Sequence, residues 1–295
     1  MMTTSGDRKA MEKKNPVSAV SAPTQFTEAG NRVLAYRSIG SGTPILLCTR
    51  FRGTLDQWDP AFLDALAENG FRVITFDYTG LGQSSGTPTY NPIEMAADVR
   101  DLIKALELKD VVLGGWSLGG MAAQAALTLY PQNITHVVLV GTTPPGPLVK
   151  PAEKLFYDLA GKDENDFEDV VALFFEPISP ASREAAARSQ ARILARTTDL
   201  SPPVPVDFAR GSLVNGPSNP AFPAPPVLET LKNTRIPILH IGGDHDIIFP
   251  VENWYALNQD LPTLTLVTFP SSGHGPHHQH PQVCADIIAS AIFNG

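Results

Sequence analysis

The stretch that decides the fold is VVLGGWSLGG, residues 111–120. It begins as a buried strand pattern, and the Ala-rich run 118–130 that overlaps its end has the pattern of a helix. Ser117 lies at the junction, with Gly115 and Gly119 two residues to either side. A sharp strand-to-helix turn strains the serine backbone and pushes its hydroxyl above the sheet, and the small neighbours let the two elements pass closely. The pattern therefore predicts a nucleophilic serine at a strand end.

Strand and helix patterns alternate on both sides of this stretch. Such alternation predicts a mostly parallel sheet with helices on both faces, the α/β class. The expected strands are 33–38, 44–48, 72–77, 111–115, 134–141, 238–242 and 264–269, and the expected helices are 58–69, 92–106, 118–130, 153–159, 166–175, 182–195, 252–258 and 282–293.

The segment 142–235 has a different texture, because it is rich in proline and shows short helical patterns but no clear strand. We interpret it as a helical lid inserted into one α/β core, which comprises residues 24–141 and 236–295. Aromatic side chains of the lid would mostly pack it onto the core, and some could line an apolar pocket. Residues 1–23 carry several lysines and no apolar stretch, and they are expected to form a flexible tail.

A serine nucleophile needs a general base, and the base needs an orienting acid. The strand 264–269 is followed by Ser-Ser-Gly-His-Gly, which offers His274 between two glycines. The strand 238–242 is followed by two candidate acids, Asp244 and Asp246. We choose Asp246, and Asp244 is the alternative that would instead bind a backbone turn. His240 is interpreted as a core residue.

Further histidines compete with His274 for the role of the base. They and the sequence Asp244-His245-Asp246 also raise the alternative of a metal site. They share one loop and lack a second ligand pair at a firm spacing, so we expect no metal and no cofactor. The competitors, interpreted as solvated residues of a loop or rim, are His277, His278 and His280.

Several motifs together resemble the α/β-hydrolase superfamily, from about Phe26 to the C-terminus. The elbow 115–119 is one, and the others are the D-x-x-G-x-G-x-S turn 77–84, the D-x-x-x-P turn 246–250 and the Gly-His pair 273–274. The resemblance implies the triad Ser117, Asp246 and His274, with a lid above the sheet. In this superfamily the acidic residue of the triad can instead follow the sixth strand. That position holds GTTP, residues 141–144, which has no carboxylate.

One motif departs from the family pattern. The family usually places His-Gly after its third strand, whereas this chain has Thr49-Arg50, followed by Phe51-Arg52-Gly53. By the resemblance, the amides of Phe51 and Leu118 form the oxyanion hole. Arg50 is open to two interpretations: a surface arginine paired with a neighbouring acid, or, together with Arg52, a pocket residue that holds a substrate carboxylate or polarises a carbonyl. Trp116 is a second candidate for substrate contact.

Composition limits the partners. The 295 residues carry a formal net charge of −8, which argues against nucleic acid and anionic membranes as partners. No apolar run is long enough to span a bilayer, and no signal peptide is recognised, so cytoplasmic residence is the default. The expected partner is a small-molecule substrate.

The function expected from these features is hydrolysis of a small to medium, largely apolar carboxylic ester or lactone through an acyl-enzyme. The same triad also serves carbon–carbon bond hydrolases, thioesterases and cofactor-free, haloperoxidase-like perhydrolases. A small-molecule receptor that kept the triad is an alternative from a different class. Fast multiple turnover would separate an enzyme from such a receptor.

Overall fold

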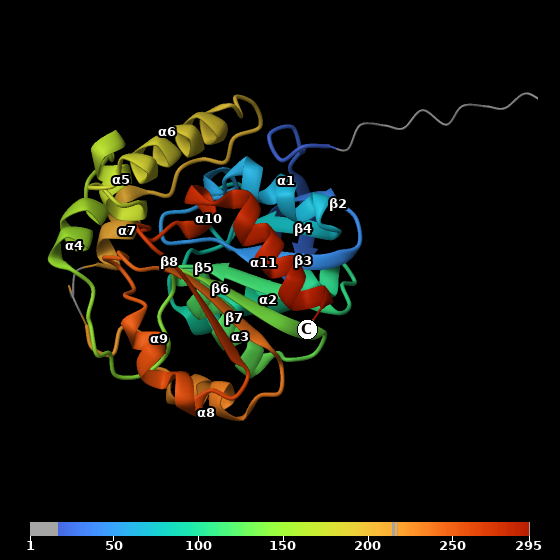
Figure 1. Cartoon of the computed structure of the whole chain (residues 1–295). Helices are drawn as coiled ribbons and strands as arrows, with labels where there is room; N and C mark the ends of the chain where they lie inside the picture. Colours follow the sequence, from blue (N-terminus) through green and yellow to red (C-terminus); the bar gives the residue numbers. More distant parts are fainter. Residues whose placement is uncertain (1–16, 214–215, 217, 295) are drawn as a thin grey trace, which may run out of the picture.

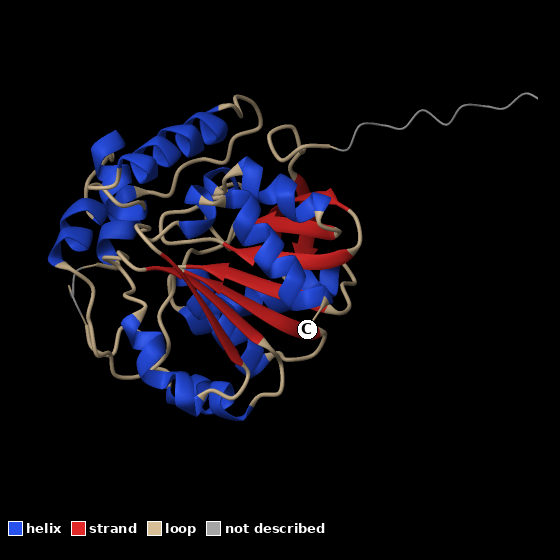
Figure 2. Cartoon of the chain, in the orientation of Figure 1, coloured by secondary structure: helices blue, strands red, loops and turns tan. Residues whose placement is uncertain are grey.

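The computed structural model describes residues 17–213, 216 and 218–294. Within these residues, eight strands form one sheet in the order β1-β2-β4-β3-β5-β6-β7-β8 (Figure 2). Only the pairs β1–β2 and β2–β4 are antiparallel, so the predicted, mostly parallel sheet is confirmed. The strands are β1 (Gln25–Ala29), β2 (Arg32–Gly40), β3 (Thr43–Cys48), β4 (Phe71–Phe76), β5 (Val111–Trp116), β6 (Ile134–Val140), β7 (Ile238–Gly243) and β8 (Leu264–Phe269).

The expected helices form at their predicted places, within a few residues at each end. The structure adds the strand β1 and the helices α7, α8 and α10, none of which was expected. The helices are α1 (Pro60–Glu68), α2 (Pro92–Ala105), α3 (Leu118–Leu129), α4 (Lys154–Ala160), α5 (Phe167–Phe174), α6 (Pro180–Leu194), α7 (Val206–Gly211), α8 (Pro225–Asn233), α9 (Glu252–Leu257), α10 (Pro276–Gln279) and α11 (Pro281–Phe293).

The core has two apolar layers, one on each face of the sheet. Successive side chains of a strand point to opposite faces, so in β5 Val112 belongs to one layer and Leu113 to the other. Helices α2, α3 and α8 cover the Leu113 face, whereas α1 and α11 cover the Val112 face (Figure 1). Both layers leave the carboxyl ends of the parallel strands free for functional loops.

In chain order, helices α4 to α8 follow β6 and precede β7. The ring of Phe174 in α5 lies 5.6 Å from the ring of Trp116 at the end of β5, which brings this part of the segment to the strand ends. Helix α8 behaves differently, because Val227 and Leu231 are buried in the same apolar cluster as α3. Only the earlier part of segment 142–235 therefore stands over the strand ends (Figure 1).

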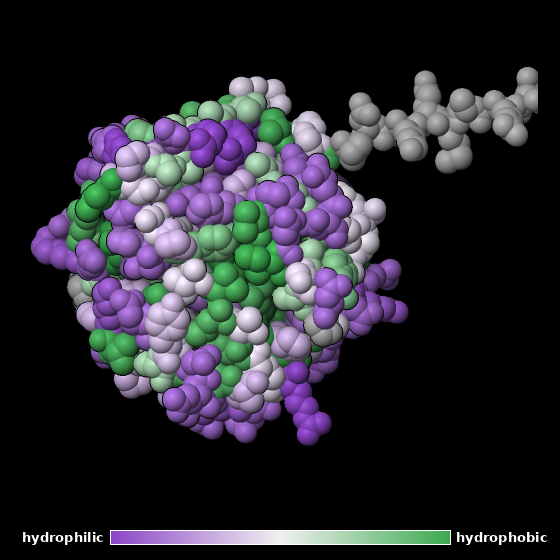
Figure 3. Space-filling view, in the orientation of Figure 1, coloured by the Kyte–Doolittle hydropathy of each residue, from purple (hydrophilic) through white to green (hydrophobic). Residues whose placement is uncertain are grey.

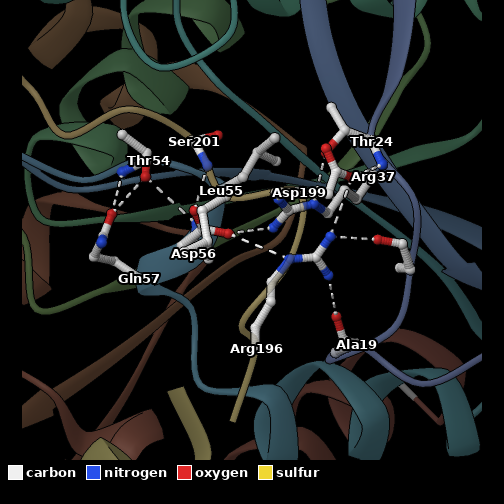
Figure 4. A network of polar contacts seen from close by, with 12 residues as sticks. Ala19, Thr24, Arg37, Thr54, Leu55, Asp56, Gln57, Arg196, Asp199 and Ser201 are labelled. Carbon is white, nitrogen blue, oxygen red and sulfur yellow. Dashed lines mark hydrogen bonds and ion pairs between the residues drawn. The ribbon is translucent and has the colours of Figure 1, made fainter. Parts of the chain in front are cut away.

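A polar network joins the N-terminal residues, the end of α6 and the core (Figure 4). Asp56 accepts from Arg37 at 2.6 Å and from the amide of Ser201 at 2.6 Å. Arg196 donates to the carbonyls of Val20 and Ala22 at 2.9 and 2.8 Å. These donors hold residues 17–23 against the core, so that part of the expected flexible tail is fixed in place, while residues 1–16 lie outside the described residues.

An apolar stripe runs along one face of the described part of the molecule. Figure 3 shows apolar residues gathered in a stripe over the middle of the face on which Figure 1 draws α11 and β8. β8 is an edge strand, and most of its side chains are only partly buried. None of the described helices combines the length and the apolar character needed to span a membrane.

Candidate active site

Ser117 lies in the sharp turn between β5 and α3, with φ 60° and ψ −124°. This backbone conformation is strained for a residue with a side chain, and such strain concentrates at functional sites. Its amide donates to the carbonyl of Val140 at 3.0 Å, which ties the turn to β6. Ser117 is only 4% exposed. The sequence predicted this turn from its glycine spacing alone.

The two flanking glycines are required by close backbone approach. A Cβ at Gly115 would collide with the carbonyl oxygen of Gly119, and a Cβ at Gly119 would collide with the carbonyl of Cys48. The strand and the helix therefore pass each other at backbone contact, as the motif predicts. This packing fixes the height at which Ser117 stands above the sheet.

Asp246 and His274 form a buried pair at the ends of β7 and β8. Nδ1 of His274 lies 2.7 Å from Oδ2 of Asp246, and both side chains are 1% exposed. The other carboxylate oxygen accepts from the amides of Ile248 and Phe249 at 2.8 and 2.9 Å. Burial alone would raise the pKa of Asp246, but the charge and hydrogen bond of His274 and these two amides lower it below the ordinary value. The carboxylate is therefore ionised and holds the imidazole in one orientation.

Asp244, the alternative acid, points elsewhere. Its carboxylate is exposed, lies 2.5 Å from Nδ1 of His245, and accepts from the amide of Ser272 at 3.3 Å. The position after β6 holds Gly141, where a Cβ would lie 2.6 Å from the carbonyl oxygen of His274. Asp246 is thus the acid that contacts His274, and the position after β6 has no room for a side chain.

Ser117 and His274 line one cavity, together with Arg50 and residues of α4 and α5. Nε2 of His274, the nitrogen that faces away from Asp246, has no hydrogen-bond partner among the described residues. Catalytic hydrogen bonds are often unformed before substrate binds. The imidazole is therefore oriented and its second nitrogen is free.

The expectation that His277 and His278 are solvated is wrong. They are 0% and 4% exposed, and their rings pack on Trp116 with centroids 4.5 and 4.7 Å away. Burial lowers the pKa of His278 to about 4 and that of His277 well below its ordinary value, so both are neutral. His280 is only partly buried and stacks on Phe269. A sequence pattern of polar residues in a loop does not reveal that helix α6 covers this loop.

Trp116 was expected as a candidate substrate contact, and the structure places it elsewhere. It is 1% exposed and does not line the Ser117 cavity. Its indole N–H donates to the carbonyl of His274 at 2.9 Å. Trp116 therefore supports the loop that carries His274 and lies beneath Arg50, whose guanidinium carbon is 5.3 Å from its ring centroid.

The turn after β3 places Phe51 at the cavity that contains Ser117. The amide of Gly53 donates to the carbonyl of Arg50 at 3.0 Å, and Arg52 has φ 55°. The Leu118 amide opens helix α3, where the first turn has no intrahelical acceptor. Both amides that the resemblance assigns to the oxyanion hole thus belong to residues beside Ser117.

Arg50 is not a surface arginine paired with an acid, so that interpretation is wrong. Its side chain is partly buried, and the described residues offer it no ion pair. Nη1 donates to the carbonyl of Phe51 at 2.7 Å, and the guanidinium carbon lies 4.7 Å from the ring centroid of Phe174. This position was hard to interpret from the sequence, because the family usually has glycine here and the rings that pack on Arg50 come from distant residues.

Arg52 also lines the cavity, but its donors are occupied. Nη1 donates to the carbonyls of Ala160 and Lys162 at 3.0 and 2.7 Å, and Nη2 donates to the carbonyl of Asp163 at 2.9 Å. These carbonyls belong to the end of α4 and the residues after it, where backbone acceptors are free. Arg52 therefore fastens α4 to the turn after β3.

Two cavities meet at Ser117. The Arg50 cavity has a volume of about 200 Å³, and its polar lining is Arg50, Arg52, Gln57 and Asn165 beside Ser117 and His274. The apolar cavity has a volume of about 230 Å³ and is lined mainly by aromatic and aliphatic side chains from the core and the segment 142–235. Four residues line both cavities, namely Phe51, Ser117, Phe156 and Ile248.

Residues 43–281 match the alpha/beta hydrolase fold family, and the chain belongs to it. An alpha/beta hydrolase fold protein from Chitinophaga pinensis is similar in structure, with a TM-score of 0.79, 28% identity and coverage of 94% of this chain and 100% of that one. An uncharacterized protein of Mycobacterium tuberculosis is 27% identical over 92% of this chain and 82% of its own. A second protein of that organism, provisionally named a non-heme bromoperoxidase, is 25% identical over 84% and 93% of the two chains.

Proposed function

We propose that this protein is a serine hydrolase that cleaves a small to medium carboxylic ester or lactone through an acyl-enzyme. The observation that carries the proposal is the buried Asp246–His274 hydrogen bond at the cavity that also holds Ser117 in its strained turn. An ionised carboxylate that orients an imidazole next to a strained serine is the arrangement that activates a hydroxyl for acyl transfer. Membership of the alpha/beta hydrolase fold family supports the same chemistry.

The residues take complementary roles in two half-reactions. Nε2 of His274 accepts the proton of the Ser117 hydroxyl as its oxygen bonds to the substrate carbonyl carbon, and Asp246 stabilises the imidazolium that forms. The imidazolium then gives this proton to the leaving alkoxide as the carbon–oxygen bond of the ester breaks. A water molecule then attacks the acyl carbon as His274 takes its proton. The imidazolium returns this proton to the Ser117 oxygen as the bond between that oxygen and the acyl carbon breaks and the acid leaves.

The developing oxyanion needs donors that do not reorganise during the reaction. The amides of Leu118 and Phe51 are assigned this role, because Leu118 opens α3 next to Ser117 and Phe51 lines the same cavity. The helix N-terminus adds a partial positive charge at Leu118. No metal or cofactor takes part in the proposed steps.

The segment 142–235 is proposed to act as a lid. Helices α4 and α5 contribute Phe156, Leu173 and Phe174 to the Arg50 cavity. Apolar walls exclude water and strengthen the electrostatics at Ser117. The substrate is thus expected to be a small molecule, since the volumes of the two cavities are only about 200 Å³ and about 230 Å³.

A second candidate function uses the same residues for perhydrolysis, in which hydrogen peroxide replaces water as the attacker of the acyl-enzyme. The relative provisionally named a non-heme bromoperoxidase favours it. A peroxide-dependent bromination assay in acetate buffer separates the two functions. Bromination much faster than ester hydrolysis would favour perhydrolysis.

The test of the proposed function is turnover of p-nitrophenyl esters by the wild type and by Ser117→Ala. We expect Ser117→Ala to lower kcat by about 10³-fold or more, because the nucleophile is lost while the cavity remains. Ser290→Ala, on the exposed side of α11, is the matched control and should retain the wild-type rate. Undiminished turnover by Ser117→Ala would contradict the proposal, and a single slow turnover in the wild type would favour a receptor.

A further inference from the structure

The Arg50 cavity is basic in an acidic protein. The chain carries 30 acidic and 22 basic residues, yet no Asp or Glu is among the residues described as lining this cavity, whereas two arginines are. One of them, Arg52, donates to three backbone carbonyls. The guanidinium donors that remain free in the cavity therefore belong mainly to Arg50.

The guanidinium of Arg50 is held in place but not neutralised. The rings of Trp116 and Phe174 lie 5.3 and 4.7 Å from its central carbon, and Nη1 donates to the carbonyl of Phe51. Nη2 has no hydrogen-bond partner among the described residues, and Nε has none either but is fully buried. Nη2 is therefore the donor that remains for a ligand in the cavity, and a charge-assisted hydrogen bond from it matches a carboxylate oxygen.

A partly buried cation without an acidic partner is costly, which makes the position informative. Burial lowers the pKa of Arg50 to about 10, and Arg52 adds to that effect against the opposing influence of Tyr90. Arg50 is still charged at neutral pH. The nearby imidazoles of His277 and His278 are neutral and add no second positive charge.

The apolar cavity lies on the other side of Ser117. It shares Phe51, Ser117 and Phe156 with the Arg50 cavity, and Met121, Phe222 and Phe249 are among its further lining residues. A substrate that reacts at Ser117 can thus extend one arm into each cavity. The two arms would meet opposite environments, one cationic and one apolar.

We propose that Arg50 binds a carboxylate on one arm of the substrate, so that the preferred substrates are monoanions with an acidic arm and an apolar arm on either side of the reacting carbonyl. This inference rests on the proposed function and names the substrate class of the same site. Half-esters of short dicarboxylic acids with apolar alcohols have this chemistry. Arg50 is a specificity-determining residue in this account, and Arg52 positions α4.

The test compares two substrates that differ only in charge: p-nitrophenyl hemiglutarate and its methyl diester. The readout is the ratio of kcat/KM for the acid to kcat/KM for the diester, in the wild type, Arg50→Met, Arg50→Lys and Arg52→Met. We expect Arg50→Met to lower this ratio about 10- to 100-fold, mainly through KM for the acid, because a hydrogen bond to a charged group is lost. Arg50→Lys should recover part of the ratio.

Arg52→Met is the matched control. It removes a cation from the same cavity, but the donors of Arg52 already bind backbone carbonyls. It should affect both substrates alike and leave the ratio within about three-fold of the wild type, as a lost positioning contact would. Equal losses on both substrates in Arg50→Met would overturn the proposal. So would an Arg52→Met variant that lowers the ratio as much as Arg50→Met does.

A binding measurement separates failure of this inference from failure of the proposed function. Calorimetric titration of Ser117→Ala with glutarate should show binding, and the double variant with Arg50→Met should bind at least about 10-fold more weakly. Arg50-dependent binding without any ester turnover by the wild type would refute hydrolysis but keep the carboxylate site. Ester turnover with no preference for the acid, and no glutarate binding, would refute the carboxylate site alone.

Discussion

Two regions that form the cavity around Ser117 differ in what determines their conformation. The strand-end loops that carry Ser117, Asp246 and His274 are set by short sequence patterns, namely a glycine-flanked turn and residues that follow a strand directly. The turn 49–53 is set by contacts from distant parts of the chain, because Arg50 packs on Trp116 and Phe174 and Arg52 binds carbonyls near residue 160. Local sequence patterns thus position the residues proposed for catalysis, whereas contacts between distant segments shape the turn proposed to bind the substrate.

The largest expected effect concerns the strand-end loops. Asp246→Asn should lower kcat on a neutral p-nitrophenyl ester by about 10³- to 10⁴-fold, because the amide no longer holds the imidazole in the productive tautomer. Asp244→Asn is the matched control, since Asp244 is exposed and contacts His245 instead of His274. A large loss of kcat in Asp244→Asn instead of Asp246→Asn would contradict the assignment of Asp246 as the acid that orients His274.

A smaller effect is expected from the turn 49–53. Arg52→Met should lower the free energy of unfolding by about 1 to 3 kcal/mol, because donors to three carbonyls are lost while those carbonyls can turn to water. Urea unfolding measures the change. Arg183→Met, which removes the exposed pair with Glu168, is the control and should leave the free energy of unfolding nearly unchanged. An unchanged free energy of unfolding in Arg52→Met would mean that the turn 49–53 does not stabilise the position of α4.

The third effect, similar in size to the second, concerns the buried histidine His240 in β7. Burial lowers the pKa of His240 from 6.5 to about 3, so the unfolded chain binds a proton between these values that the folded protein does not. Stability is therefore present above pH 6.5 and is lost as the pH falls. Between pH 7 and pH 5 His240 should account for about 2 kcal/mol of that loss. Urea unfolding of His240→Leu at both values should show a correspondingly flatter dependence, and an unchanged slope would contradict the neutral, buried state.

The sequence predicted the sheet, most of its helices and the positions of Ser117, Asp246 and His274 after strand ends, because local patterns determine these features. Strand β8 was predicted at its observed bounds, and Asp246 was preferred over Asp244 from the turn that follows it. Helix α7 was missed because six residues carry too little periodicity. The burial of His277 and the packing of Arg50 on Phe174 were missed because each depends on the segment that packs over the strand ends.

The central claim is that Ser117 is the nucleophile, and covalent labelling tests it most directly. A fluorophosphonate probe is incubated with the wild type and with Ser117→Ala, followed by intact-mass analysis and peptide mapping. We expect one adduct per wild-type chain, located on Ser117, and none on the Ser117→Ala variant. An adduct on a different residue, or equal labelling of Ser117→Ala, would contradict it.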